Sequence, residues 1–124
     1  MKKSGAELFE EGIDLFNQGR FFECHEAWEE VWKRSRGDDK RFYQGLIQAA
    51  VAILHAQRGN RDGARSLYGK ARAKLDPTPD EYMGLAISKL RDELAKFFEA
   101  ALSDGGGVPL APKLNRLNQR RSRL

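Results

Sequence analysis

The sequence is poor in cysteine and in long apolar runs, and each shortage excludes a class of protein. Cys24 is the single cysteine among 124 residues, so an internal disulfide framework is excluded and a reducing compartment is expected. The longest apolar run, Ala49 to Leu54, is far shorter than the roughly 18 residues of a membrane span. The first residues turn acidic soon after two lysines, so we expect no signal peptide. These absences predict a cytoplasmic protein without membrane contact.

Apolar residues are instead spread through the chain at helical spacing. The sequence is 40% hydrophobic and 32% charged, which is typical of a globular domain. At this length the chain can form one core but not two. No segment alternates apolar and polar residues for long enough to indicate a strand. We therefore expect an all-α fold.

Five helices are predicted, with short loops between the first four. The first begins after Ser4, which forms a capping-box pattern with Glu7. A second such pattern, Thr78 with Glu81, predicts that the fifth helix begins at Pro79. Since short loops make successive helices antiparallel, we expect a bundle of helical hairpins, distantly similar to tetratricopeptide repeats. The expected helices are residues 5–17, 21–34, 39–57, 61–75 and 79–102.

The C-terminal part is predicted to be a basic tail. Three glycines, residues 105–107, end the helical pattern. Residues 113–124 hold five of the 22 basic side chains and no acid, which leaves 17 basic against 18 acidic residues elsewhere. We expect one helical domain, residues 1–104, followed by a flexible tail, residues 105–124. Because the tail lacks aromatic residues for base stacking, nucleic acid is expected to contact it weakly at most.

The predicted third helix carries one narrow polar stripe on an otherwise apolar surface. Gln44, Gln48 and His55 form this stripe, and no acid or lysine lies between Arg41 and Arg58. A stripe that faces water usually carries charge, so the uncharged stripe is predicted to be partly buried.

The predicted second helix offers a partner for this stripe. His25, Glu29 and Trp32 follow the i, i+4, i+7 pattern along one margin of its apolar face. Antiparallel packing would bring this margin to the stripe and form a polar crevice. Cys24 adjoins His25, but neighbouring helical residues point about 100° apart, so a buried and inert thiol is favoured over a nucleophile.

Three interpretations of the crevice stay open. It can be a hydrogen-bonded network that fixes helix register, because an unsatisfied buried polar group costs about 1–3 kcal/mol. It can be a pocket for a small molecule or a peptide. It can also bind a metal or transfer protons through two imidazoles and one carboxylate, those of His25, Glu29 and His55. The sequence favours the network.

Two motifs resemble those of domain-of-unknown-function family 309, a group of small helical proteins known mainly from bacteria and archaea. The first is residues 19–32, GRFFECHEAWEEVW, and the second combines QGLIQ at residues 44–48 with His55 and Gly59-Asn60. The resemblance extends over about residues 8–75 and implies a helical bundle, but no activity. It implies motif positions at His25, Glu26, Glu29, Trp32, Gln44, Gln48, His55 and Asn60.

The sequence favours a non-catalytic interaction or small-ligand-binding module, and self-association through Phe and Trp side chains is one form of it. This interpretation requires no cofactor and no metal. The alternative is a small metal-binding protein or enzyme that uses the His/Glu/His crevice between the second and third helices. Whether any residue is catalytic, and what the partner is, stays open. The candidate site residues are His25, Glu26, Glu29, Trp32, Gln44, Gln48 and His55.

Overall fold

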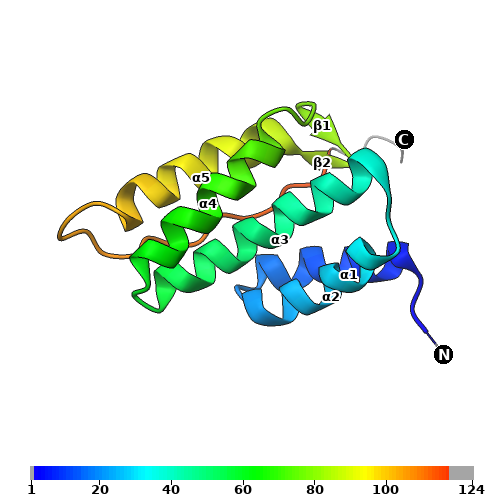
Figure 1. Cartoon of the computed structure of the whole chain (residues 1–124), viewed down its shortest axis with the longest axis horizontal. Helices are drawn as coiled ribbons and strands as arrows, with labels where there is room; N and C mark the ends of the chain where they lie inside the picture. Colours follow the sequence, from blue (N-terminus) through cyan, green and yellow to red (C-terminus); the bar gives the residue numbers. More distant parts are fainter. Residues whose placement is uncertain (1, 118–124) are drawn as a thin grey trace, which may run out of the picture.

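The computed structural model describes residues 2–117, and these form five α-helices and one short β-hairpin (Figure 1). This arrangement confirms the all-α helical bundle. None of the helices in this part of the chain has the length and apolar character needed to cross a membrane. The elements, in chain order, are α1 (Gly5–Asn17), α2 (Phe21–Lys33), α3 (Gly37–Gln57), α4 (Arg61–Leu75), β1 (Glu81–Tyr82), β2 (Leu85–Ala86) and α5 (Ile87–Ala101).

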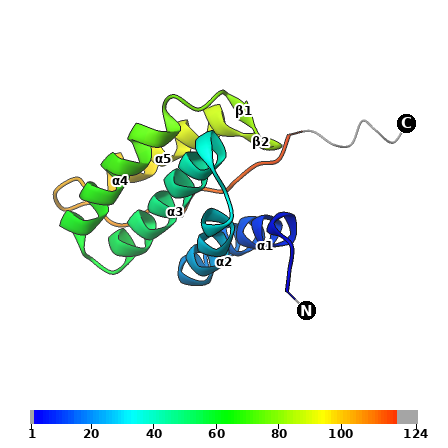
Figure 2. The same ribbon diagram turned by 45° about the vertical axis from the view of Figure 1, so that its right-hand side comes forward.

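The helices pack in the order in which they follow one another. α1 packs on α2, α2 on α3 and α3 on α4, so α3 lies at the centre of the row. Figures 1 and 2 show α5 beside α4, on the side of the molecule away from the α1–α2 hairpin. This order leaves one edge of α2 and α3 uncovered by the later helices.

Local sequence signals explain where the first helices begin and end. The capping box of α1 forms as expected, because the Ser4 hydroxyl accepts from the Glu7 amide and the Glu7 carboxylate accepts from the Ser4 amide. Gly19 follows the helix with a φ of +78°, a value that favours glycine. Its position allows the chain to reverse directly into α2.

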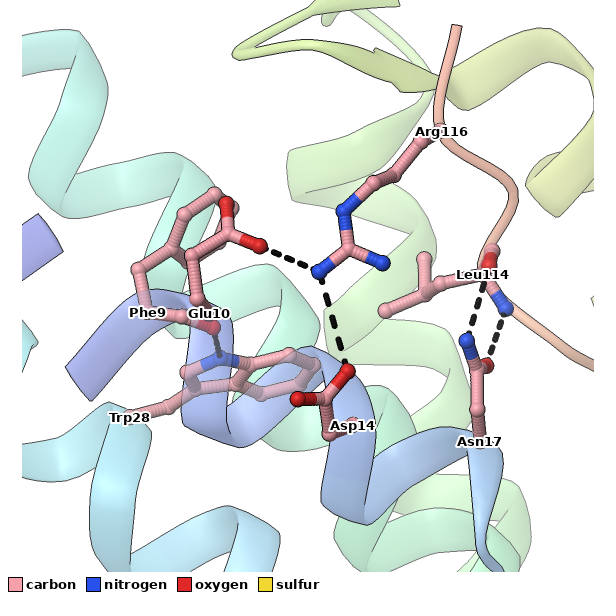
Figure 3. A network of polar contacts seen from close by, with 7 residues as sticks. All are labelled: Phe9, Glu10, Asp14, Asn17, Trp28, Leu114 and Arg116. Atoms are coloured by element: carbon pink, nitrogen blue, oxygen red, sulfur yellow. Dashed lines mark hydrogen bonds and ion pairs between the residues drawn. The ribbon is translucent and has the colours of Figure 1, made fainter. Parts of the chain in front are cut away.

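Aromatic side chains hold the α1–α2 hairpin together. Trp28 is fully buried, and its indole N–H donates to the carbonyl oxygen of Phe9 at 3.2 Å (Figure 3). Phe16 contacts the rings of both Phe21 and Trp28, with centroids 5.1 and 5.9 Å away. The hydrogen bond satisfies the one polar atom that this aromatic cluster buries.

The fifth helix begins later than the sequence indicated. The expected start at Pro79 is wrong, because Glu81 and Tyr82 pair with Ala86 and Leu85 in a hairpin, and α5 begins at Ile87. The two turn residues, Met83 and Gly84, have φ values of 51° and 76°, as a tight two-residue hairpin loop requires.

The Thr78 and Glu81 pattern that suggested the earlier start does not cap a helix. The Thr78 hydroxyl donates to the carbonyl oxygen of Lys74 at 2.9 Å instead of capping a helix. The first amides of α5, those of Ile87 and Ser88, donate to the carbonyl oxygen of Asp80 at 2.7 and 3.1 Å. A backbone carbonyl thus takes the capping role that we had assigned to a side chain.

The segment after α5 also differs from the flexible tail that we expected. Leu114 is 3% exposed, and its backbone N–H and carbonyl oxygen bond to the Asn17 side chain at 2.7 and 3.0 Å (Figure 3). Arg116 forms ion pairs with Glu10 and Asp14 of α1. One buried leucine and a matched amide therefore fix residues 111–117 against the helices. The rest of the expected tail, residues 118–124, lies outside the described residues.

Candidate functional site

The uncovered edge of α2 and α3 contains most of the residues that the sequence singled out. Nζ of Lys40 lies 4.3 Å from the centre of the Trp32 ring, so the end of α2 is level with the start of α3. Gln44 and Gln48 follow Lys40 by four and eight residues and therefore share its face of α3. The structure thus places the Trp32 end of this margin beside the face of α3 that carries Gln44 and Gln48.

His25 occupies this edge as part of a pair within α2. Its Nε2 lies 3.5 Å from the Glu29 carboxylate, and the two side chains are 27% and 46% exposed. The ring of Phe22 is 6.1 Å from the imidazole, centre to centre. This pair faces water in part, so its ion-pair energy is small.

His55 belongs to a different structure, the turn between α3 and α4. Its Nδ1 is 3.2 Å from the side-chain nitrogen of Asn60, and Asn60 caps α4 by accepting from the amide of Gly63 at 3.0 Å. A Cβ atom on residue 63 would lie 2.6 Å from the Asn60 side chain, so a larger residue there would displace the cap. His55, Asn60 and Gly63 together build this turn.

The two histidines do not share a site. His25 precedes Trp32 by seven residues, whereas His55 follows Lys40 by fifteen. At 1.5 Å per residue, His55 is about 12 Å farther along the helix pair than His25. Among residues 2–117 no group of three His, Cys, Asp or Glu side chains could hold a metal ion. The His25, Glu29 and His55 set therefore does not assemble.

Two polar atoms at the edge are buried without a hydrogen-bond partner in the described chain. They are the indole N–H of Trp32, a donor, and the side-chain oxygen of Gln48, an acceptor. Both side chains are half-buried, as is Gln44. The internal network that the sequence favoured is therefore incomplete at these two atoms, and each adds an unfavourable desolvation energy.

Cys24 has the inert character that we expected. It is fully buried, and burial raises the pKa of its thiol well above the usual range. A thiol in this state is neither a nucleophile nor a metal ligand. The structure therefore gives Cys24 a packing role.

The exposed part of the edge carries charges of both signs. Glu26 lies in the first half of α2 and Lys33 at its end, and both are exposed. Phe22 is 52% exposed, although the adjacent Phe21 is buried. We define the α2–α3 edge as Phe22, His25, Glu26, Glu29, Trp32 and Lys33 of α2 with Lys40, Gln44 and Gln48 of α3.

Three members of this edge, Phe22, Lys33 and Lys40, were not predicted from the sequence. Phe22 could have been predicted from its angular position around the helix, because it lies off the apolar stripe that contains Phe21 and Cys24. Lys33 and Lys40 gave no such signal, since isolated lysines on helix surfaces are common. Only the packing of α2 on α3 places these two lysines at the edge.

Comparisons with known proteins match the same region. A family described as "Domain of unknown function (DUF309)" matches residues 9–67. Residues 9–67, slightly less than half of the chain, are therefore similar to the DUF309 family. The matched range includes all of α2 and α3 and the turn that begins α4. The α2–α3 edge is therefore part of the DUF309 region, whereas α5 and the C-terminal segment are not.

Two bacterial relatives are longer than this chain. An "Uncharacterized protein" of Aquifex aeolicus (strain VF5) is 32% identical over 87 residues, which cover 69% of this chain and 26% of that protein. "Uncharacterized protein YpuF" of Bacillus subtilis (strain 168) is 48% identical over 82 residues, 64% of this chain and 47% of YpuF. The chain thus spans about half of one relative and about a quarter of the other.

Packing accounts for part of the DUF309 motif residues. Trp28 joins α1 to α2, and His55 and Asn60 build the α3–α4 turn. A Cβ atom on residue 45 would lie 3.0 Å from that of Lys74, so Gly45 allows α3 and α4 to approach closely. The motif residues without such a role are those of the α2–α3 edge. Their assignment to a functional site stays a prediction.

Proposed function

We propose that the chain is a non-catalytic interaction module that self-associates through the α2–α3 edge. The exposed Phe22 is the observation that carries this proposal, because a large aromatic ring faces water among motif residues without a packing role. Burying a phenylalanine contributes about 1.5–3 kcal/mol. Aromatic side chains of this kind are the usual anchors of protein–protein contacts.

The charge distribution of α2 supports a second copy of the chain as the partner. In a two-fold symmetric contact, each residue of the surface meets a different residue of the same surface on the other copy. If two α2 helices cross antiparallel near Glu29, Glu26 of one copy faces Lys33 of the other. Both residues are exposed. Glu26 and Lys33 are therefore complementary in charge across this contact, while the two Glu29 side chains lie together at its centre.

The two unpaired atoms of the edge support the same conclusion. Both atoms are buried in the single chain, so a partner could pair with them only after the side chains turn outward, and pairing would then remove a cost of about 1–3 kcal/mol at each atom. Rotation of the half-buried Gln48 amide would bring its oxygen to the contact surface. Trp32 lies beside Lys40, and Gln48 follows Lys40 by eight residues, so the two side chains are about 12 Å apart along the axis of α3. An elongated partner fits this spacing better than a compact molecule.

A catalytic role has less support from the same geometry. An acid–base pair needs a reacting atom held between its members, but the polar partner of His25 within residues 2–117 is Glu29 of its own helix. His55 lies with Asn60 at the far end of α3. The buried Cys24 thiol offers no nucleophile. These placements favour binding over chemistry at the α2–α3 edge.

Sedimentation equilibrium of the whole chain tests the proposal. The apparent mass of wild type is expected to rise with protein concentration from the 14.1 kDa of one chain towards twice that value. Phe22→Ser is expected to weaken the association at least tenfold. Leu110→Ser is the matched control, because Leu110 is 95% exposed and lies far from the edge in sequence.

A single-chain mass for wild type up to about 1 mM would contradict the proposal, because even an association of about −4 kcal/mol is visible there. Equal association of wild type and Phe22→Ser would contradict the assigned surface.

A further inference from the structure

A groove lies between α4 and α5. These two helices are on the side of the molecule away from the α1–α2 hairpin (Figures 1 and 2). Its volume is about 660 Å³, within the range of small-molecule sites. Arg65, Tyr68 and Arg72 form one wall from a single face of α4. The other wall comes from α5 and includes Phe98, Ala95, Glu99 and Leu102. The sequence did not indicate this groove, because its walls are about 30 residues apart.

Two arginines connect the helices at the ends of the groove. At one end, Arg61 of α4 donates to the carbonyl oxygen of Ser103 at 2.6 Å. At the other, Arg91 of α5 donates to the carbonyl oxygens of Leu75 and Thr78 at 3.1 and 2.8 Å. Each cross-link joins one helix to the backbone at the end of the other.

Two further arginines, Arg65 and Arg72, line the groove and are only weakly engaged. Arg65 is 3.3 Å from the fully exposed Asp62, and Arg72 is 3.8 Å from Asp76. The arginine side chains are 58% and 60% exposed. Ion pairs this exposed contribute about 0–1 kcal/mol. An anionic ligand can therefore replace the aspartates at little cost.

The floor of the groove is aromatic. Tyr68 stacks on Phe98 with ring centroids 4.2 Å apart, and the guanidinium of Arg72 lies 5.6 Å from the Tyr68 ring centre. Burial raises the pKa of Tyr68, so its hydroxyl stays protonated at neutral pH. The described chain gives this hydroxyl no hydrogen-bond partner. Cations, one donor and an apolar floor are thus combined in one groove.

We propose that this groove binds a small organic phosphate whose phosphate group lies between Arg65 and Arg72 and whose ring packs over Tyr68, Ala95 and Leu102. Guanidinium groups match phosphate oxygens in paired hydrogen bonds, and two of them balance its double charge. Glu99 repels the phosphate from the α5 wall, which fixes the ligand's orientation. This inference is independent of the α2–α3 edge.

Calorimetric titration of the whole chain with phenyl phosphate, and separately with inorganic phosphate, tests the proposal. Phenyl phosphate is expected to bind saturably at one site per chain and at least tenfold more tightly than inorganic phosphate. Arg65→Gln and Arg72→Gln are each expected to weaken binding about tenfold. Lys70→Gln is the matched control, because Lys70 is an exposed cation of α4 that does not line the groove.

Backbone amide spectra of the same samples locate the ligand. Shifts are expected around Tyr68, Ala95 and Phe98, and the unliganded spectra of the variants show whether they are folded. Absence of saturable binding would overturn the proposal. So would equal binding by wild type and Arg72→Gln, or inorganic phosphate binding as tightly as phenyl phosphate.

Discussion

A Cβ atom on residue 12 would lie 2.0 Å from Nε1 of Trp28, so the backbone of Gly12 is in direct contact with the indole ring. The same Nε1 donates to the carbonyl oxygen of Phe9, one turn earlier in α1. Any side chain on residue 12 must displace the ring and with it this hydrogen bond. The contact therefore sets the distance between α1 and α2, and it fixes the side of α2 that remains uncovered.

We expect Gly12→Ala to lower the free energy of unfolding by about 1–3 kcal/mol, the usual cost of overpacking a core. Urea denaturation followed by circular dichroism measures it. Gly69→Ala is the control, since a Cβ atom there meets nothing within 4 Å and the residue lies inside α4. This control should gain about 0.5–1 kcal/mol, because alanine favours the helix. Loss of stability in both variants would contradict the explanation.

The segment after α5 is expected to stabilise the bundle through Leu114. Leu114→Ala should cost about 2–3 kcal/mol, because it empties a buried leucine site. Leu110→Ala removes the same atoms from a side chain that is 95% exposed, and should change stability by less than about 0.5 kcal/mol. Thermal or urea unfolding of both variants compares them. Equal effects would show that residues 111–117 do not pack against α1.

His55 is expected to act with Asn60 and independently of His25. A double-mutant cycle of His55→Ala and Asn60→Ala should give a coupling of about 0.5–1 kcal/mol, because each removes the same contact and weakens the cap of α4. The cycle of His25→Ala and His55→Ala should be additive within about 0.5 kcal/mol. Strong coupling of the two histidines would revive the shared-site interpretation.

Stability at alkaline pH is expected to depend on Tyr82. Its hydroxyl donates to Asp39 at 2.6 Å, and this hydrogen bond raises the pKa of Tyr82 from 10.0 to about 12. Between these values the folded chain holds a proton that the unfolded chain has lost. The contribution is therefore complete below pH 10 and is lost as the pH rises through about 12.

Urea midpoints from about pH 9 to about pH 11 measure this effect. Wild type should lose more stability over this interval than Tyr82→Phe, in which the titrating group is absent. The variant should still decline, because burial also raises the pKa values of Tyr43 and Tyr68. Identical slopes would contradict the role assigned to the Tyr82 hydrogen bond.

Local signals predicted the first four helices to within two residues at each end, although α3 begins at Gly37 instead of residue 39 and neither α2 nor α3 has a side-chain cap. α4, for example, was expected at residues 61–75 and is observed there, since Asn60 caps it and Pro77 follows its end. The hairpin before α5 has no such local cause. It depends on Asp80, which bonds the first amides of α5, and on the amide of Ala86, which donates to the carbonyl oxygen of Asn115. Contacts this distant leave no pattern within one helix.

The face of each helix that carries the candidate site could be predicted from the sequence, but the relative position of the two helices along their axes could not. Helical spacing places His25, Glu29 and Trp32 on one margin of α2 and Gln44 with Gln48 on one face of α3. The distance along the helices depends on one contact, Lys40 over Trp32, which the sequence does not reveal. With Lys40 beside Trp32, His55 lies farther along the helix pair than the other candidate site residues. The charge pair that supports self-association, Glu26 and Lys33, likewise became apparent only when the uncovered edge was known.

Mixing two charge-reversal variants tests the central claim most directly, namely that two copies pair through antiparallel α2 helices. Glu26→Lys and Lys33→Glu each place like charges together in their own pairs, and each alone should sediment as a single chain. In an equal mixture both contacts join opposite charges, so the account predicts that the dimer returns. Two variants that stay single when mixed, or that associate as wild type does when alone, would contradict it.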